Sequence, residues 1–349
     1  MTDEVLIELD GNIGRMRLNR PKAIHALTSD MVHAMTAALV EWRDDEEVTA
    51  VILDHAEGRG FCAGGDIRLL SESVQGDCTA AERFYFDEYR LNHLMFTYPK
   101  PIIVFMDGIT MGGGVGITMP CRYRIATERT VYAMPETGIG LFPDVGGGWF
   151  LPRLPGRSGA YLGTTGNRIN GADCKALGIA THYMPSDSVG SVKARIIGDH
   201  AHLVAILEES SVTPPEAPFE AVRADIDRLF ASDRFEDILA ALRAEGGEWA
   251  DKQFDILTTK SPQTIKVALR QLAEGGRMTD FADNMRMEFR LACHVVRRPD
   301  FVEGVRAVIV DKDNAPRWNP ATPEATTDEL IDSLFAPLPA DKEWTPLPA

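Results

Sequence analysis

Two carboxylates stand in an apolar, glycine-rich stretch of the chain. Glu136 and Asp144 fall in segment 134–148, which otherwise holds mostly glycine, proline and apolar side chains. Burial raises the pKa of a carboxylic acid and so suits it to general acid–base or nucleophilic catalysis. The pair therefore predicts a catalytic site. The alternative is that one of them only caps a helix, as Asp144 would before 145–148.

Two more glycine-rich loops each follow a buried strand. Segment 61–66 reads Phe-Cys-Ala-Gly-Gly-Asp, and segment 108–116 reads Gly-Ile-Thr-Met-Gly-Gly-Gly-Val-Gly. Both place backbone N–H groups without side-chain cover at a strand end that opens a helix, and such groups bind anions and developing oxyanions. The alternative is a pair of tight turns in which glycine only relieves the strain of a positive φ.

Motifs for other chemistries are absent from the sequence. It has no Gly-Lys pair and hence no phosphate-binding P-loop, no G-x-S-x-G elbow and no H-E-x-x-H. The eight histidines show no spacing typical of metal ligands. Segment 58–63 matches a dinucleotide fingerprint only loosely, because Gly64 and Gly65 interrupt the helix that should follow. We therefore expect no metal site and no redox cofactor.

Composition describes a folded, acidic chain. Of its 349 residues 44% are hydrophobic, and 36 Lys+Arg against 52 Asp+Glu give a net charge of −16. Nucleic acids and anionic membranes are therefore poor partners. The nearly uncharged segment 101–120 contains Asp107 and three consecutive glycines, which disfavours a membrane span. An acidic start without a signal core, and five cysteines without a C-x-x-C pair, predict free thiols and a cytoplasmic location.

The elements that must position these loops change along the chain. The pattern of two strands and a helix recurs early, whereas helices dominate after about residue 189. The expected strands are 5–9, 13–18, 48–53, 101–106, 123–126, 131–134 and 179–184. The expected helices are 28–43, 171–178, 221–230, 235–243, 253–259, 263–273 and 279–292. We divide the chain into an α/β core at 1–188, a helical region at 189–318 and a proline-rich tail at 319–349.

In order and spacing, the three loops resemble the crotonase (enoyl-CoA hydratase/isomerase) superfamily. The similarity starts at Asn19-Arg20-Pro21, runs to about Ile179, and resumes at 261–262 and 301–307. Within the superfamily the sequence is most similar to the 3-hydroxyisobutyryl-CoA hydrolase branch. The segments that carry this similarity are 133–137, 141–148, 151–154 and 306–313.

The resemblance implies a spiral of ββα units with a helical C-terminal region, and a coenzyme A thioester as substrate. The backbone N–H groups of Gly65 and Gly113 would hold the thioester oxygen. Glu136 would be the main catalytic carboxylate, either activating water or attacking the thioester. Asp144 would orient the substrate hydroxyl or assist proton transfer, and Glu88 would help bind that hydroxyl unless it is only a solvated helix carboxylate.

One departure separates the branches of the superfamily. Enoyl-CoA hydratases that resemble this chain carry a second catalytic Glu where Gly116 stands here. Loss of that acid favours an acyl-CoA hydrolase, acting on 3-hydroxyisobutyryl-CoA or a close 3-hydroxyacyl-CoA in valine breakdown. The alternatives are an enoyl-CoA hydratase or isomerase, and a non-catalytic acyl-CoA-binding protein, which would need the N–H pair but not Glu136 and Asp144.

The coenzyme A end of the site is less readable. His25 stands where relatives usually have Asn, and is expected at the coenzyme A edge of the site. Lys22, Arg20 and Lys312 are candidates to meet the phosphates, although each is more often a solvated charge. Coenzyme A would arrive as part of the substrate. Crotonase relatives often form trimers, so a homo-oligomer is expected as well.

Overall fold

The computed structural model describes residues 2–74 and 76–348. The strands form two sheets. The larger has the order β1-β2-β3-β5-β7-β10 and the smaller the order β4-β6-β8-β9. In the larger sheet the strand bounds are Val5–Asp10, Ile13–Leu18, Ala50–His55, Ile102–Met106, Tyr123–Ala126 and His182–Tyr183. In the smaller sheet they are Gly60–Cys62, Ile109–Met111, Val131–Ala133 and Ile169–Asn170.

Each turn of the chain places one strand in each sheet. Strand β3 is followed by β4, β5 by β6, and β7 by β8, and each sheet pairs these successive strands in parallel. Parallel pairing brings the carboxyl ends of neighbouring strands to one edge. The loops after β4, β6 and β8 therefore meet at one place, and the expected spiral of ββα units is confirmed.

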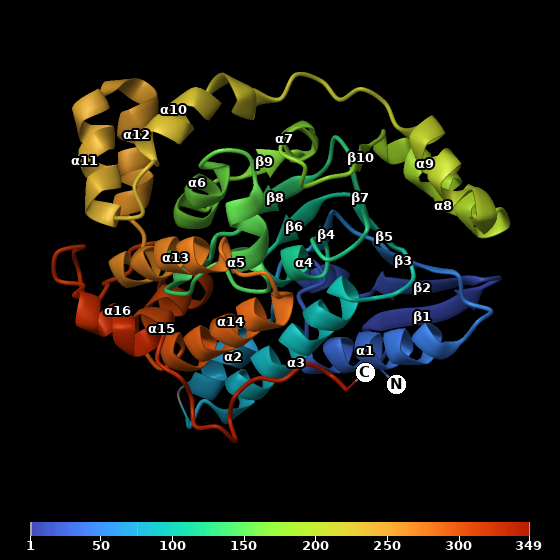
Figure 1. Ribbon diagram of the computed structural model, residues 1–349, viewed down its shortest axis with the longest axis horizontal. Coiled ribbons are helices and arrows are strands. Elements are labelled where there is room, and N and C mark those ends of the chain that lie inside the picture. Colours follow the sequence, from blue (N-terminus) through green and yellow to red (C-terminus); the bar gives the residue numbers. More distant parts are fainter. Residues whose placement is uncertain (1, 75, 349) are drawn as a thin grey trace.

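Helices wrap this double sheet (Figure 1). In the first half of the chain α1 spans Ser29–Asp44, α2 Ile67–Val74, α3 Thr79–Phe96 and α4 Gly113–Gly116. They are followed by α5 Gly147–Phe150, α6 Ser158–Thr165 and α7 Gly171–Ala176. The start of α1 follows from the sequence, because the Thr28 hydroxyl accepts the N–H of Met31 as an N-cap.

The later part of the chain is helical. It contains α8 Val189–Gly198, α9 Leu203–Ser210, α10 Arg223–Leu229, α11 Phe235–Glu245, α12 Gly247–Thr258, α13 Pro262–Gly275, α14 Phe281–Val295, α15 Pro299–Val305 and α16 Asp328–Leu334. Helices α11 and α12 form a hairpin at the upper left of Figure 1, whereas α13, α14 and α15 lie against the core. A π-helix, Arg306–Val310, continues α15.

The last residues return to the body of the protein. The side chain of Trp344 is fully buried, and its indole N–H donates to the Phe86 carbonyl of α3 at 3.2 Å. Arg90, also on α3, donates to the Thr345 carbonyl at 2.8 Å. These contacts hold the end of the described chain against α3. The division of the chain into three parts remains a prediction.

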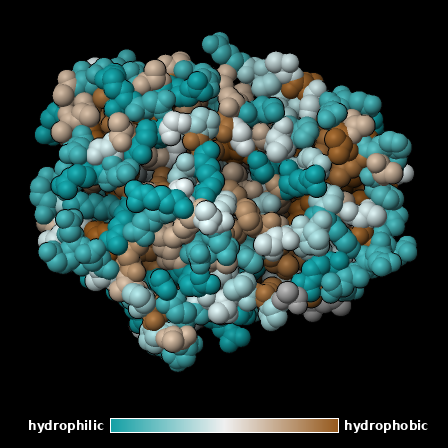
Figure 2. Space-filling view, in the orientation of Figure 1, coloured by the Kyte–Doolittle hydropathy of each residue, from teal (hydrophilic) through white to brown (hydrophobic). Residues whose placement is uncertain are grey.

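Figure 2 shows a largely hydrophilic face on which hydrophobic residues form small, separate patches. Within residues 2–74 and 76–348, no helix combines the length and apolar character needed to cross a bilayer. All five cysteines are buried and unpaired.

Candidate functional site

Two glycine loops bring a pair of backbone N–H groups together. One loop follows β4 and contains Gly65, and the other follows β6 and contains Gly113, the first residue of α4. A Cβ atom placed on Gly113 would lie 3.1 Å from the Gly65 nitrogen, so the two backbones nearly touch. Among the hydrogen bonds of the described residues, neither N–H has an acceptor. Both are therefore available to a ligand.

The loop around Gly65 is fixed by its neighbours. Leu27 donates its N–H to the Gly64 carbonyl at 2.7 Å and accepts the Asp66 N–H at 2.9 Å. This bridge uses the groups on either side of Gly65 and leaves the Gly65 N–H free. Gly64 has a φ of +121° and Gly112 a φ of +51°, conformations that glycine adopts without the cost of a Cβ.

Glu136 faces this N–H pair from the next strand of the smaller sheet. It begins the 3-10 helix Glu136–Ile139, three residues after the end of β8. The side chain is buried, and its Oε2 has no hydrogen-bond partner in the structure. Its Oε1 would lie 3.2 Å from a Cβ placed on Gly112. The carboxylate thus lies beside the loop that supplies the second N–H.

Two more carboxylates are buried nearby. Asp144 accepts a hydrogen bond from the Tyr89 hydroxyl at 2.8 Å. Glu88, on α3, is buried, and its Oε1 has no partner in the structure. That oxygen lies 2.6 Å from the position of a Cβ on Gly113, so any side chain there would displace the Glu88 carboxylate. Three acids therefore converge on the N–H pair.

Burial shifts the proton affinity of all three acids. Loss of solvation raises the pKa of Glu88 and of Glu136 well above the ordinary range, and neighbouring acids add to the effect on these two. Loss of solvation also raises the pKa of Asp144 to about 7, although the bond from Tyr89 favours its charged form. A group that titrates near neutrality, as Asp144 does, can take up and release protons during a reaction.

All five residues expected in the site line one cavity of about 370 Å³. These are Gly65, Glu88, Gly113, Glu136 and Asp144. The wall is otherwise mostly apolar and includes Ile67 and Leu70 of α2, Phe84 and Tyr85 of α3, and Leu141 and Val145. A pocket with an apolar wall and a few convergent polar groups is typical of small-molecule sites.

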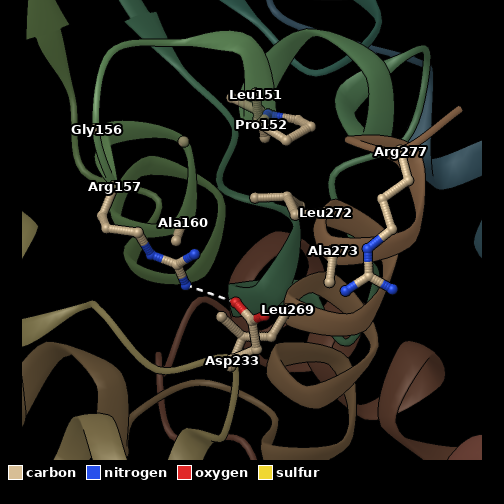
Figure 3. A pocket seen from close by; sticks show the side chains of 11 residues that line it. Leu151, Pro152, Gly156, Arg157, Ala160, Asp233, Leu269, Leu272, Ala273 and Arg277 are labelled. Atoms are coloured by element: carbon tan, nitrogen blue, oxygen red, sulfur yellow. Dashed lines mark hydrogen bonds and ion pairs between the residues drawn. The ribbon is translucent and has the colours of Figure 1, made fainter. Parts of the chain in front are cut away.

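A second hollow lies elsewhere and contains none of these acids (Figure 3). It has a volume of about 200 Å³ between α6 and α13. Arg157 and Asp233 form an ion pair across it at 2.7 Å, and Leu272 and Arg277 line its other side. Cations and apolar groups line this hollow, but none of the buried acids does. The larger cavity is therefore the candidate site for a reaction.

The comparisons agree with this geometry. The Enoyl-CoA hydratase/isomerase family matches residues 13–335. The chain belongs to this family. A relative from Danio rerio, named 3-hydroxyisobutyryl-CoA hydrolase, mitochondrial, is 42% identical over 96% of this chain and 90% of its own. The expected family membership is therefore confirmed.

Two solved structures are also similar to this chain. A carnitinyl-CoA dehydratase from Mycobacterium thermoresistibile has a TM-score of 0.94 and 40% identity, covering 99% of both chains. An enoyl-CoA hydratase from Rhodobacter sphaeroides 2.4.1 has a TM-score of 0.92 and 38% identity, covering 98% of this chain and 100% of its own. The crotonase-like fold is shared along the whole chain.

One expectation is overturned by the same relatives. The sequence predicted a cytoplasmic location, from an acidic start and unpaired cysteines. The relatives from Danio rerio and Homo sapiens are both named as mitochondrial enzymes, so this prediction is wrong. Free thiols indicate only a reducing environment, which is not peculiar to one compartment.

Gly116, where the resemblance predicts a second catalytic Glu in enoyl-CoA hydratases, packs against the residue that follows Asp144. A Cβ on Gly116 would lie 2.5 Å from the Val145 Cβ and 3.1 Å from the Asn92 amide nitrogen. Val145 holds this place with a φ of +52°, a strained conformation for a β-branched residue. The space that a second catalytic Glu would need at Gly116 is therefore filled.

Two residues expected at the coenzyme A end make contacts within the protein. His25 is fully buried; its Nδ1 accepts the Arg20 N–H at 2.9 Å and its Nε2 lies 2.8 Å from the Glu57 carbonyl oxygen. It ties two loops together, and its place at the coenzyme A edge of the site stays a prediction. The Arg20 guanidinium is engaged by Glu4 and Asp66, both at 3.0 Å.

Several residues of the cavity carry no signal in the sequence. Lys22 and Lys312 are exposed but do not line the cavity, whereas Arg168 and Lys260 do. Tyr89, which holds Asp144, follows Glu88 directly on α3, but nothing in the spacing distinguishes it from a core tyrosine. Val308 and Ile309 reach the cavity from the π-helix, more than 150 residues beyond Asp144.

Proposed function

We propose that this protein hydrolyses 3-hydroxyisobutyryl-CoA, or a close 3-hydroxyacyl-CoA, to the free acid and coenzyme A. The observation that carries the proposal is Glu136, a buried carboxylate with an unpartnered oxygen, placed beside two free N–H groups. The name of the Danio rerio relative supports the same reaction. A role in valine breakdown is consistent with this substrate.

The N–H groups of Gly65 and Gly113 bind the thioester oxygen. When a nucleophile adds to the thioester carbon, this oxygen gains negative charge, and two preformed donors stabilise it without reorganisation. Removing one such donor typically costs about 3–4 kcal/mol of transition-state stabilisation. The same pair would bind any acyl-CoA, so it explains affinity for the substrate class but not the choice of reaction.

Glu136 supplies the nucleophile. As a base, it removes a proton from water, whose oxygen attacks the carbonyl carbon. As a nucleophile, its own oxygen attacks and forms a mixed anhydride that water then opens. In both routes the C–S bond breaks, and the sulfur leaves as thiolate and takes up a proton. The raised pKa of Glu136 makes its carboxylate a stronger base than an exposed one.

Asp144 and Glu88 recognise the substrate hydroxyl. Both acids are buried and line the cavity on the side of α3, and Glu88 has an oxygen without a partner. A hydroxyl can donate to one acid and accept from the other when that acid is protonated. The raised pKa values favour such a mixed state near neutral pH. Asp144 is also placed to return a proton to the leaving group.

Hydration of an enoyl-CoA is the second candidate, favoured by the name of the Rhodobacter sphaeroides structure. Water addition needs one group to orient water and another to protonate Cα. The place of the second acid is Gly116, which Val145 blocks. We therefore propose hydrolysis, with coenzyme A entering as part of the substrate and no metal or redox cofactor.

Thiol release across a panel of coenzyme A thioesters tests this function. We expect release from 3-hydroxyisobutyryl-CoA and negligible water addition to crotonyl-CoA. Isobutyryl-CoA lacks only the hydroxyl and leaves buried acceptors unpaired, so kcat/KM should be about ten- to hundredfold lower. Fast crotonyl-CoA hydration without thiol release contradicts the reaction. Equal hydrolysis of isobutyryl-CoA contradicts both the hydroxyl-recognition role and the specific substrate, and leaves the thioester hydrolase class standing.

A further inference from the structure

Another buried carboxylate, Glu288, lies outside the cavity and behind the turn formed by residues 144–148. This side chain is on α14 and is fully buried. Its Oε2 accepts the Gly146 N–H at 2.7 Å. Its Oε1 accepts the Gly148 N–H at 2.8 Å, the Asn284 amide at 2.9 Å and the Gln271 amide at 3.0 Å. All four donors point at one carboxylate, and two of them belong to the turn that carries Asp144.

The turn is held on its other flank as well. The Gln271 amide that donates to Glu288 also donates to the Pro143 carbonyl at 2.7 Å. Gly147 donates its N–H to the Asp144 carbonyl at 2.8 Å. The backbone on both sides of Asp144 is therefore fixed by α13 and α14, which follow it by more than 100 residues.

The packing beneath the turn leaves it little freedom. A Cβ on Gly275 of α13 would lie 2.1 Å from the Gly148 carbonyl oxygen, and one on Gly148 would lie 2.6 Å from Asn284 Oδ1. Within the turn, Val145 has the unfavourable φ of +52°. Strained backbone of this kind persists only where the surroundings hold it in place.

We propose that Glu288 is a positioning residue for the reaction: it holds the 144–148 turn so that the Asp144 carboxylate meets Tyr89 and faces the cavity. The inference rests on the proposed role of Asp144. A simpler possibility is that Glu288 only satisfies buried donors and stabilises the fold. The two differ in whether the effect of Glu288 on turnover passes through Asp144.

The substitution Glu288→Gln changes the hydrogen bonding without changing the shape. An amide has one acceptor oxygen, whereas the carboxylate accepts four bonds with two. The NH₂ group of the new amide would take the place of one carboxylate oxygen and face either the Gly146 N–H or the three donors at Oε1. Because NH₂ is itself a donor, it cannot accept hydrogen bonds from these groups. Gly146 lies two residues after Asp144, so loss of these hydrogen bonds should shift the backbone of the turn at Asp144.

A double-mutant cycle with Asp144→Asn separates the two possibilities. The measurement is kcat for thiol release from 3-hydroxyisobutyryl-CoA, per folded protein by circular dichroism. Alone, Glu288→Gln should lower kcat at least ~10-fold, whereas in the Asp144→Asn background it should lower kcat less than ~3-fold further. Equal fold-losses in both backgrounds overturn the proposal.

The control is Leu291→Ala, which removes buried volume from the same helix at a residue with no hydrogen bond to the turn. It should lower the melting temperature and act equally in both backgrounds.

If Glu288→Gln does not fold, Gln271→Met takes its place in the cycle, because it removes the bonds to Pro143 and Glu288 with little change in volume. A wild type that releases no thiol contradicts the proposed function and, with it, this role. An active wild type with independent effects contradicts only the role of Glu288.

Discussion

The two sides of the cavity are built by different means. On one side, the N–H groups of Gly65 and Gly113 come from loops whose shape is set by short parallel strands and by glycine conformations. On the other side, the acids depend on partners far along the chain: Tyr89 from α3 for Asp144, and Glu288 from α14 for the turn beside it.

The difference suggests how one fold supports several reactions. Binding a thioester oxygen needs only backbone, which any sequence with these glycines supplies. The choice of reaction depends on which acids surround it and how distant helices hold them. A relative named hydrolase and solved structures named hydratase and dehydratase are about 40% identical to this chain, and the two solved structures share its fold. Substitutions of the acids and of the loop glycines should therefore change the kinetic constants in different ways.

The largest expected effect is on the acid side. Glu136→Gln keeps the size of the side chain but removes the basic and nucleophilic oxygen. We expect kcat for thiol release to fall by about 10²–10⁴-fold. KM should change little, because the N–H groups that we propose as the thioester-binding pair are intact. Steady-state kinetics with 3-hydroxyisobutyryl-CoA measures both constants.

The control for this prediction is Glu216→Gln, which makes the same chemical change at an exposed position. It should leave both constants unaltered. Near wild-type turnover in Glu136→Gln would make that residue structural, and Asp144 would become the leading catalytic candidate.

A single methyl group added at Gly113 should impair the side of the cavity that carries the backbone N–H groups. In Gly113→Ala the new Cβ would lie 2.6 Å from Glu88 Oε1 and 3.1 Å from the Gly65 nitrogen, between the two groups that the substrate must reach. We expect kcat/KM to fall by about 10²–10³-fold, comparable to losing an oxyanion donor, with KM raised as well. Binding of a non-hydrolysable thioether analogue, measured by calorimetry, should weaken in parallel.

Gly190→Ala is the matched control, because nothing lies within 4 Å of a Cβ at that position in α8. It should bind and turn over normally. If Gly113→Ala lost kcat but kept its affinity for the analogue, the backbone side would take part in the chemical step without contributing to ground-state binding.

The same contrast explains what the sequence could predict. The glycine loops, the strands that precede them and the position of Glu136 follow from local pattern, and the structure brings all five expected site residues to one cavity. Glu288 and Gln271 could not be found in this way, because an acid or amide on an amphipathic helix looks the same whether it faces solvent or a buried turn. The contact of His25 with Glu57, 32 residues away, could not be found from the sequence for a related reason.

The smallest expected effect is on protein stability, because burial of the charged Asp144 carboxylate makes folding less favourable. Burial raises the pKa of Asp144 from 3.8 to about 7, so the folded protein keeps this proton over a range in which the unfolded chain has lost it. Folding therefore becomes less favourable as pH rises from about 4 to 7, and the cost is complete above that range. Asp144→Asn has no such proton, and its amide oxygen can still accept the Tyr89 hydroxyl.

The melting temperature of Asp144→Asn, relative to wild type, should therefore rise between pH 5 and pH 8, by on the order of 3 °C. Differential scanning calorimetry at the two pH values measures it. The exposed Asp251→Asn should show no such rise, because solvent surrounds its carboxylate in both states. A flat difference would mean that folding leaves the pKa of Asp144 unchanged, and a fall with pH would mean that the fold stabilises its carboxylate. The acid side would then resemble the backbone side, with no stability given up for reactivity.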